Sequence, residues 1–428
     1  MCGIVGSVGS LYLSRFKNSL NSIKHRGPDN EGVYFYDLQE KYVVGENDLL
    51  TDNSYVAFGH RRLSIIDLAD TAHQPMTRDN YILIFNGEIY NYKEIRSELL
   101  EKGYEFETES DSEVLLAAYI YWGKHCVSKF NGMWAFCIFD KLNQEFFISR
   151  DRIGVKPLYY YLDDENFYFA SEIKALLEFN ISRVANKKEI LKFLIYGAQE
   201  NTENTTFNNI FRFPAGYNAV FCLKKNKLKL EKYFELEDHN VESNKTEDEL
   251  IESIKMVVDD SVNLRLRSDV EIGMALSGGV DSNIVVNLSN TKSPGISTFS
   301  SIYTEDVSIN ETDNIKITVE KLKLNSNFTT VNKNDIFDDI ENIVWHQDEP
   351  FDTLGILAQN KVYELMNSKG VKVSLDGQGA DEIYSGYPTY DSVFLRENLT
   401  NILMYKYFIK SGFFTMNNLK LLTLSFFP

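Results

Sequence analysis

Hydrophobic and polar positions follow different patterns in the two halves of the chain. In the first half, apolar and aromatic runs of strand length lie at residues 81–85, 133–139, 145–149 and 166–170. Helical spacing intervenes at residues 92–102, where Ile95, Leu99 and Leu100 share one face, and at residues 112–122. This mixture predicts a sandwich of antiparallel sheets with flanking helices.

A polar and acidic stretch at residues 235–249 has no apolar period and predicts a connection between domains, followed by a helix over residues 250–265. Beyond it, runs typical of buried strands alternate with helical patterns. The predicted strands cover residues 270–276, 295–302 and 371–375. The predicted helices cover residues 283–289, 315–324, 336–345 and 359–369. This alternation predicts a doubly wound parallel sheet.

Composition narrows the classes of function. The chain has 428 residues, with 44 Lys and Arg against 62 Asp and Glu, so its net charge is −18. This acidic balance repels phosphates at long range, so we expect no nucleic-acid partner and no membrane attachment. The four cysteines show no paired spacing, which favours a reduced, cytoplasmic setting over a disulfide framework or a zinc site.

Cys2 directly follows the initiator methionine, and Ile4 and Val5 place it at the start of a predicted buried strand. Removal of Met1 would leave a thiol and a free α-amine on one residue. The α-amine has a reference pKa of about 8 and can activate its own side chain as a base. Taken alone, Cys2 is better explained as a small buried thiol without a chemical role.

Four further segments follow Cys2 in a fixed order. With CGIVG at residues 2–6, they are HRGPD at 25–29, GHRRLSII at 59–66, NGEIY at 86–90 and SDSE at 110–113. Together these segments resemble the class II glutamine amidotransferases, which have an N-terminal nucleophile. The resemblance implies that Cys2 attacks the side-chain amide of glutamine and releases ammonia through a glutamyl thioester.

The same resemblance assigns roles to other residues. Asn86 and Gly87 would form the oxyanion hole, although Asn-Gly alone also favours a hairpin turn. Arg62 would bind the α-carboxylate of glutamine, the alternative being a surface ion pair. Glu88 and Asp111 would hold its α-ammonium. The complete implied glutamine-binding set is Arg62, Leu63, Ser64, Ile65, Ile66, Asn86, Gly87, Glu88 and Asp111. Three histidines receive no catalytic role: His25, His60 and His73.

The segment SGGVDS at residues 277–282 joins a predicted strand to a predicted helix. A glycine-rich turn into a helix binds anions, because unpaired N–H groups and the helix dipole point outward. Asp281 would repel phosphate unless Mg²⁺ bridges the two, so the segment indicates a metal–nucleotide site. A plain turn with a capping residue is the alternative. The segment resembles the pyrophosphate loop of the ATP pyrophosphatases.

A second acidic and glycine-rich segment, DGQGADE, covers residues 376–382 and follows another predicted strand. Such residues at the carboxyl end of a parallel strand suit a second Mg²⁺ contact or an ammonium site. Asp381 is the second candidate metal ligand beside Asp281, and Glu382 is a candidate for orientation. An acidic solvent-exposed turn is the alternative.

The order of these motifs, from Cys2 to about Tyr387, resembles the glutamine-hydrolysing asparagine synthetases. The resemblance implies that ATP adenylates the side-chain carboxylate of aspartate. Ammonia would then cross an internal tunnel and displace AMP, giving asparagine. The implied ATP-binding set is Leu276, Ser277, Gly278, Gly279, Asp281, Ser282, Ser301, Asp376 and Gly377. Gln378, where many members have Glu, would take part in forming the intermediate.

We therefore expect a two-domain α/β and α+β protein with ATP and Mg²⁺ as cofactors and with glutamine, aspartate and ATP as small-molecule partners. Residues 2–217 would form an αββα sandwich of the N-terminal nucleophile type, residues 218–249 a connector, and residues 250–428 a doubly wound ATP-binding domain. A homodimer is a possible assembly.

Two features keep alternatives open. The family's synthetase domain normally continues further and supplies a phosphate-binding lysine, but only 41 residues follow Tyr387, so we expect an incomplete domain. Three lysines near the end lie in no matching motif: Lys406, Lys410 and Lys420. The alternatives are an amidotransferase that acts on another carboxylate, such as a sugar acid, or a truncated form that retains only glutaminase activity.

Overall fold

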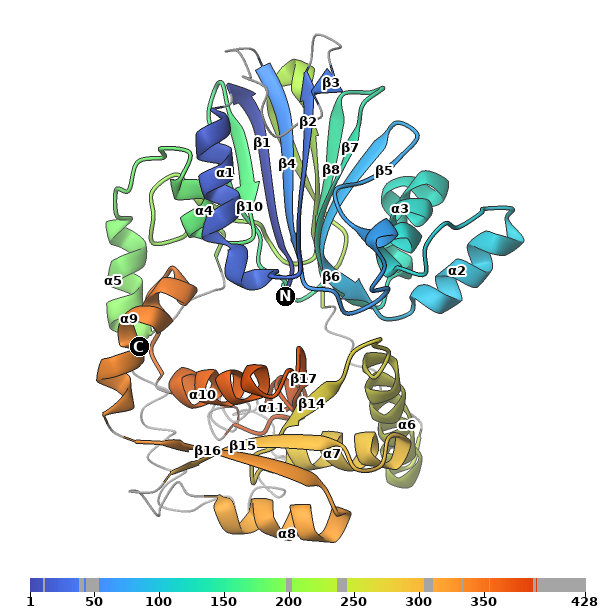
Figure 1. Cartoon of the computed structure of the whole chain (residues 1–428), viewed down its shortest axis with the longest axis vertical. Helices are drawn as coiled ribbons and strands as arrows, with labels where there is room; N and C mark the ends of the chain where they lie inside the picture. Colours follow the sequence, from blue (N-terminus) through green and yellow to red (C-terminus); the bar gives the residue numbers. More distant parts are fainter. Residues whose placement is uncertain are drawn as a thin grey trace, which may run out of the picture. The chain divides into compact units, whose positions relative to one another are not determined.

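The structure is a computed structural model that describes residues 1–10, 12–37, 42–43, 54–197, 202–236, 245–303, 311–332, 334–353, 355–387 and 390 (Figure 1). Backbone contacts divide the chain into two compact units. The first comprises Met1–Glu271 and Lys333–Asn360, and the second comprises Ile272–Asn332 and Lys361–Pro428. The predicted tail with Lys406, Lys410 and Lys420 lies outside the described residues.

A seven-stranded antiparallel sheet in the first unit has the order β11-β9-β10-β1-β4-β2-β3. Its strands are β1 (Gly3–Ser10), β2 (Asn30–Asp37), β3 (Tyr42–Val43), β4 (Ser54–Arg62), β9 (Tyr159–Leu162), β10 (Phe167–Ala170) and β11 (Phe211–Arg212). Strand β1 is central and pairs with β4 over its whole length. The chain therefore begins inside the sheet.

A six-stranded antiparallel sheet has the order β13-β12-β8-β7-β6-β5. Its strands are β5 (Met76–Arg78), β6 (Tyr81–Ile89), β7 (Gly132–Asp140), β8 (Glu145–Arg150), β12 (Tyr217–Cys222) and β13 (Lys227–Lys232). The sheet continues past residue 217 through β12 and β13. The predicted end of the first domain at residue 217 and the predicted end of the connector at residue 249 remain predictions.

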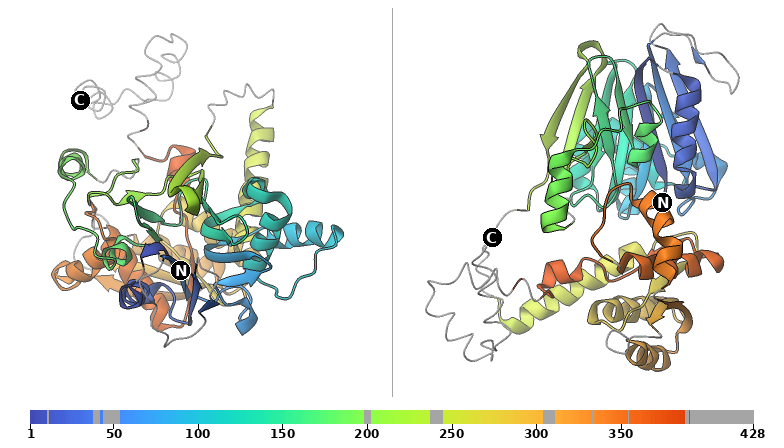
Figure 2. Two further views of the ribbon diagram at one scale, coloured as in Figure 1. Left: turned by 90° about the horizontal axis from the view of Figure 1, so that it is seen from above. Right: turned by 90° about the vertical axis from the view of Figure 1, so that its left-hand side faces the viewer.

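The two sheets pack face to face because their inner surfaces are apolar. Ile4 and Phe58 from one sheet share a buried cluster with Ile84 and Phe139 from the other. Helices cover the outer faces (Figures 1 and 2). They are α1 (Leu13–Ser22) and α4 (Ile173–Leu177) on the seven-stranded sheet, and α2 (Tyr92–Glu101) and α3 (Asp111–Trp122) on the six-stranded sheet. The predicted αββα sandwich is confirmed.

The first unit contains further helices outside the sandwich layers. These are α5 (Lys187–Tyr196), α6 (Glu247–Arg265) and α9 (Asp335–Gln347), with short 3₁₀ turns η1 (Lys24–Arg26), η2 (Asp70–Ala72), η3 (Gly123–Lys129) and η4 (Leu223–Lys225). The segment after α9 is fixed to the sandwich by two ion pairs. Lys174 Nζ lies 3.1 Å from Asp348 Oδ1, and Arg212 Nη2 lies 2.7 Å from Glu349 Oε2.

The second unit is built on a four-stranded parallel sheet with the order β16-β15-β14-β17. Its strands are β14 (Ile272–Ala275), β15 (Ser297–Tyr303), β16 (Asn325–Val331) and β17 (Val373–Leu375). The helices are α7 (Val280–Lys292), α8 (Thr312–Leu322), α11 (Ala380–Tyr384) and, from residue 361 onward, α10 (Gly355–Ser368). This part of α10 packs on β15 through Val362, Met366 and Phe299. Figure 1 shows α8 and α10 on opposite sides of β15. The predicted doubly wound parallel sheet is confirmed.

Two elements of the second unit were not predicted. Strand β16 reads NSNFTTV, in which Asn and Ser interrupt any apolar run. Helix α11 has only five residues, too few for a periodic pattern. Among the described residues, no helix is both long enough and apolar enough to span a bilayer.

Candidate active sites

Cys2 lies at the start of the central strand of its sheet, immediately before β1. Its sulfur accepts a hydrogen bond from the Leu63 N–H at 3.4 Å. Gly3 lies opposite Arg61 in the β1–β4 ladder, so this register brings the thiol to the residue that follows β4. The strand pairing therefore joins Cys2 to the predicted glutamine-binding segment.

The HRGPD segment fixes the backbone of Cys2. Arg26 Nε donates to the Cys2 carbonyl at 2.8 Å, and Arg26 Nη1 pairs with Glu172 Oε1 at 2.8 Å. His25 Nε2 lies 3.0 Å from the same carboxylate oxygen. Burial alone would raise the pKa of Glu172, but the His25 hydrogen bond and the charges of Arg26 and Lys174 hold it well below its usual range. Glu172 thus stays ionised and anchors Arg26.

Asn86 and Gly87 lie within β6, opposite Ala135 and Trp134 of β7. The hairpin-turn alternative for this pair is therefore wrong. Asn86 is fully buried, and neither its amide nitrogen nor its amide oxygen has a hydrogen-bond partner in the described part of the chain. A buried amide without protein partners is costly to the fold, so we expect a water or a ligand atom to complete its hydrogen bonds. Gly87 is required because a Cβ there would lie 2.1 Å from the Met133 carbonyl oxygen.

His60 supports this part of β6 from the other sheet. Its Nε2 lies 3.0 Å from the carbonyl oxygen of Phe85, the residue before Asn86. Burial lowers the pKa of His60 to about 3, so its ring is neutral and Nε2 is the donor. His60 therefore ties β4 to β6 beside the unbonded amide, as a positioning group rather than a base.

Two buried carboxyl groups lie at the end of β6 that follows Asn86. Glu88 is on β6, and Asp111 begins α3 and accepts a hydrogen bond from the Ile89 N–H at 3.0 Å. Burial, together with the charge of Glu88, raises the pKa of Asp111 to about 7, and burial also raises the pKa of Glu88. A bound ammonium would relieve both costs, which suits the predicted role of these residues.

Arg62 is buried and not part of a surface ion pair, so that alternative is wrong. Its Nη1 donates to the Ala69 carbonyl at 3.0 Å, and its Nη2 donates to the Asp67 carbonyl. The guanidinium thus shapes the loop of residues 63–69. The Ser64 N–H in the same loop donates to Asp29 Oδ2 at 2.8 Å, and Ile66 is buried in the core beneath α2 and α3.

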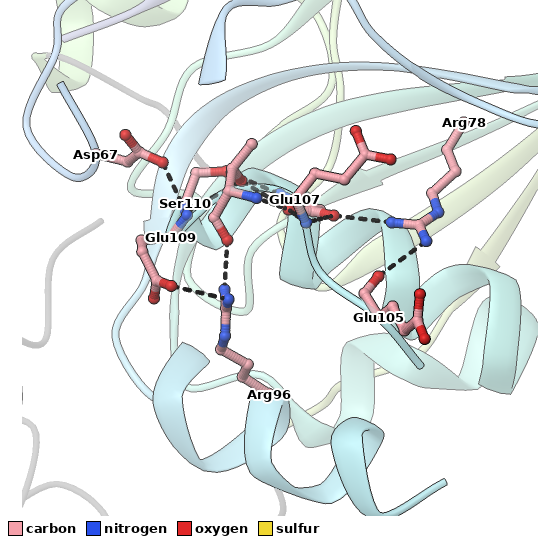
Figure 3. A network of polar contacts seen from close by, with 9 residues as sticks. Asp67, Arg78, Arg96, Glu105, Glu107, Glu109 and Ser110 are labelled. Atoms are coloured by element: carbon pink, nitrogen blue, oxygen red, sulfur yellow. Dashed lines mark hydrogen bonds and ion pairs between the residues drawn. The ribbon is translucent and has the colours of Figure 1, made fainter. Parts of the chain in front are cut away.

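The loop that precedes Asp111 is tied to Asp67 of the loop of residues 63–69 (Figure 3). The Glu109 N–H donates to Asp67 Oδ2 at 2.8 Å, while Arg96 Nη1 donates to the Thr108 carbonyl at 2.6 Å. Ser110 caps α3 by accepting from the Glu113 N–H at 3.2 Å. These contacts bring both predicted glutamine-binding loops of the first unit together.

The SGGVDS loop of the second unit already binds a negative oxygen. The Gly278 N–H donates to Glu311 Oε2 at 2.8 Å, and Ser277 Oγ lies 2.9 Å from Ser282 Oγ. Because the Gly278 N–H donates to a carboxylate, the backbone of the loop has a geometry that can bind an anion. Glu311 itself was not singled out in the sequence, since it lies in no motif.

The DGQGADE segment meets the SGGVDS loop inside the second unit. A Cβ on Gly377 would lie 2.7 Å from the Ser282 nitrogen, so only glycine allows the close approach. Leu276 is tied to β15 by its N–H to the Phe299 carbonyl at 3.0 Å, and Ser301 continues β15. Burial raises the pKa of Asp376, whose Oδ1 accepts from the Gln378 N–H at 3.2 Å. The predicted ATP-binding residues thus gather around one pair of loops.

No group of three or more His, Cys, Asp or Glu side chains among the described residues could hold a metal by itself. Mg²⁺ is usually held by one or two carboxylates together with substrate phosphates, so Asp281 at the anion loop fits that donor set. Asp381 lies against Gly386, whose N–H donates to its carbonyl at 2.9 Å. Both aspartates remain predicted ligands that would act with a bound nucleotide.

Lys156 is the main residue of the first site that the sequence did not reveal. It is buried, and Nζ lies 3.2 Å from Met1 Sδ. The surrounding segment, RDRIGVKP, is polar without periodicity and resembles an ordinary loop. The sequence of such a loop does not indicate that one of its basic residues is buried.

Comparisons with known proteins agree with this division of motifs. A family profile described as a glutamine amidotransferase domain matches residues 1–234. A second profile, described as asparagine synthase, matches residues 253–422.

Three relatives match nine-tenths or more of this chain. A protein of Methanocaldococcus jannaschii, provisionally named glutamine-hydrolysing asparagine synthetase 2, is 37% identical over 91% of this chain and 76% of its own length. Asparagine synthetase 1 of Bacillus subtilis is 34% identical over 91% of this chain, which spans 59% of that relative. Amidase chry2 of Gibberella zeae is 26% identical over 90% of this chain and 57% of its own. The chain belongs to the family of glutamine-hydrolysing asparagine synthetases.

Proposed function

We propose that this chain transfers the amide nitrogen of glutamine to a carboxylate activated by ATP, with the side chain of aspartate as the acceptor and asparagine as the product. The observation that carries the glutamine half is Asn86, a fully buried amide on β6 whose side chain has no hydrogen-bond partner among the described residues; His60 ties the preceding residue of β6 to β4. An unbonded donor in a dry setting suits a developing oxyanion.

The chemistry at Cys2 follows from these groups. With Met1 removed, the α-amine of Cys2 takes the thiol proton, and the sulfur attacks the side-chain carbonyl carbon of glutamine. Asn86 Nδ2 and the Gly87 N–H stabilise the oxyanion. The C–N bond breaks as the α-ammonium returns the proton to the leaving nitrogen, and water then hydrolyses the thioester to glutamate. Glu88 and Asp111 hold the α-ammonium of the substrate, and Arg62 its α-carboxylate.

The second unit would bind ATP through Ser277, Gly278, Gly279 and Ser282, with Mg²⁺ neutralising phosphate charge near Asp281. The acceptor carboxylate attacks the α-phosphorus and pyrophosphate leaves. Ammonia then attacks the acyl carbon, and AMP leaves with the oxygen. Adenylation is needed because a free carboxylate resists attack by an amine.

The names of the relatives support aspartate as acceptor, since two of them are named asparagine synthetases. The fungal relative that is named an amidase favours a second candidate, an amidotransferase with a different carboxylate acceptor.

All four cysteines of the chain are free, which suits a reduced, cytoplasmic setting.

Pyrophosphate release in the presence of glutamine, ATP and Mg²⁺ tests the proposal. We expect release to require aspartate and to yield asparagine in equal amounts. Dependence on another carboxylate would establish the second candidate. Hydrolysis of glutamine without any pyrophosphate release would contradict both and leave a glutaminase alone.

A further inference from the structure

Lys156 is a buried cation that the proposed mechanism does not use. Only 5% of its surface is exposed. Its N–H donates to Asp151 Oδ2 at 2.9 Å, and its carbonyl accepts from Arg150 Nε at 2.7 Å. Asp151 also accepts from the Val155 N–H at 2.8 Å. The loop between β8 and β9 is therefore closely bonded, and it holds Lys156 in a defined position.

The ammonium of Lys156 reaches the amino terminus of the chain. Its Nζ lies 3.2 Å from Met1 Sδ, and Arg26 Nη2 lies 3.9 Å from the same sulfur. A thioether is a weak acceptor, so it satisfies a buried ammonium poorly. Removal of Met1 would take this partner away and leave the ammonium beside the new terminus at Cys2.

The charges around this position act on one another. Burial holds the pKa of the Cys2 thiol above its ordinary value, although the amino terminus, the Leu63 N–H and Lys156 each lower it. Burial lowers the pKa of Lys156 to about 8, so the side chain is mostly protonated at neutral pH. The groups that act on Lys156 and Cys2 are Glu88 on β6, Arg26 on η1, Asp151 after β8, Asp111 on α3 and the amino terminus.

We propose that Lys156 is a positioning residue of the glutaminase centre, whose ammonium stabilises negative charge on Cys2 Sγ. This inference rests on the proposed role of Cys2 as nucleophile. The thiolate is the attacking form, and a buried thiol ionises readily only beside a positive charge. The α-amine gains the thiol proton and then passes it to the leaving nitrogen, so its charge is transient. Lys156 keeps its proton throughout and supplies a permanent charge.

The test measures the alkylation of Cys2 by iodoacetamide as a function of pH, in the full chain after mass spectrometry has confirmed the loss of Met1. In Lys156→Met, the inflection of the alkylation rate plotted against pH should move up by about one pH unit. Alkylation at neutral pH should become about three- to tenfold slower. Lys156→Arg keeps the charge and should remain within about twofold of the unaltered protein.

Lys124→Met is the matched control, because Lys124 is exposed and its Nζ pairs with Glu231 at 2.9 Å. It should leave the alkylation profile unchanged. An unchanged inflection in folded Lys156→Met would overturn the proposal. If that variant fails to fold by circular dichroism, Lys156→Gln takes its place.

A second readout compares the two Lys156 variants. The ultraviolet absorbance of the Cys2 thiolate, taken as the difference between each protein and its Cys2→Ala counterpart, should titrate at a higher pH in Lys156→Met than in Lys156→Arg. Equal inflections in the two variants would overturn the inference. Because none of these readouts uses glutamine, a shifted thiol in a chain that hydrolyses no glutamine would contradict the proposed function alone.

Discussion

The surroundings of Cys2 in the first unit and those of Ser277 in the second differ in how far the protein itself completes them. Asn86 is fully buried, and Glu88 and Asp111 expose only 8% and 6% of their surfaces. Ser277 is exposed, and the N–H of Gly278 next to it already donates to Glu311 of its own unit. The surroundings of Cys2 are buried and include the Asn86 amide, which has no partner among the described residues. The surroundings of Ser277 are exposed, and one of their N–H donors is already bonded to Glu311.

This difference follows from the substrates that we propose. The amide of glutamine is neutral, so its transition state needs donors that packing has placed in advance. A nucleotide brings several negative charges, so a short glycine-rich loop and a helix terminus suffice to attract it. Changes in the first region should therefore act on catalysis, and changes in the second on nucleotide use.

The largest effect should come from Cys2→Ala, which separates the two regions completely. Without the sulfur no acyl-enzyme forms, and pyrophosphate release with glutamine should fall by about 10⁴-fold or more. Release with ammonium chloride as nitrogen source should stay within about twofold, since the second region is unaltered. Parallel loss of both activities would refute this separation.

Asn86→Ala tests whether the first region acts through its buried donor. Loss of one oxyanion donor should lower kcat for glutamine hydrolysis about 10²- to 10³-fold with little change in KM. Asn143→Ala is the control, because Asn143 is exposed in the β7–β8 turn and its Nδ2 bonds Asp140 at 2.7 Å. A raised KM at constant kcat would instead make Asn86 a ground-state binding group.

Asp281→Ala is the corresponding change in the second region. Pyrophosphate release should fall about 10²-fold. The Mg²⁺ ion that neutralises the phosphate charge would lose a carboxylate ligand. Glutamine hydrolysis should persist. Asp313→Ala, in the first turn of α8, controls for loss of an exposed acid. Equal losses in both variants would show a general electrostatic effect instead of a site at SGGVDS.

Protonation of His60 in the unfolded state should weaken the first unit in acid, whereas Asp111, whose pKa burial raises to about 7, acts in the opposite direction over the same range. Burial lowers the pKa of His60 to about 3, against about 6.5 in an unfolded chain. The unfolded state therefore takes up a proton between pH 7 and 5 that the folded state does not, which lowers stability by about 2 kcal/mol.

His60→Gln should flatten this pH dependence of the free energy of unfolding, measured with urea. His125→Gln should not, because His125 is exposed on η3. An unchanged slope in His60→Gln would mean that His60 is not neutral in the fold.

The smallest effect should come from Glu311→Gln, which removes the charge that the anion loop already binds. A neutral amide competes less well with phosphate, so KM for ATP should fall about two- to fivefold. Glu320→Gln on α8, the helix that begins directly after Glu311, is the control. A higher KM would show that Glu311 supports nucleotide binding rather than competing with it.

Much of the architecture could be predicted because it rests on periodicity. The alternation of strands and helices predicted the parallel sheet, and short apolar runs predicted β6, β7 and β8. The predicted strand ended at residue 85 because Asn-Gly resembles a turn. In the structure β6 continues to Ile89, since pairing with β7 overrides the local preference of these two residues.

The chemistry beside the motifs could not be predicted, because it depends on segments distant in sequence. Gly3 lies opposite Arg61, and this register alone brings Cys2 to Leu63. Lys156 and Glu311 act through contacts that no local pattern encodes. Motif residues are recognisable by composition, whereas the groups that tune their charge are set by tertiary packing.

Residues 333–360 belong to the first unit although they follow the start of the second in sequence. Asp348 and Glu349 from this segment pair with Lys174 and Arg212. Cutting the protein at the polar stretch before α6 would part both cations from these carboxylates. A fragment designed to hydrolyse glutamine by itself should therefore carry the later segment as well, either fused to it or added back as a peptide.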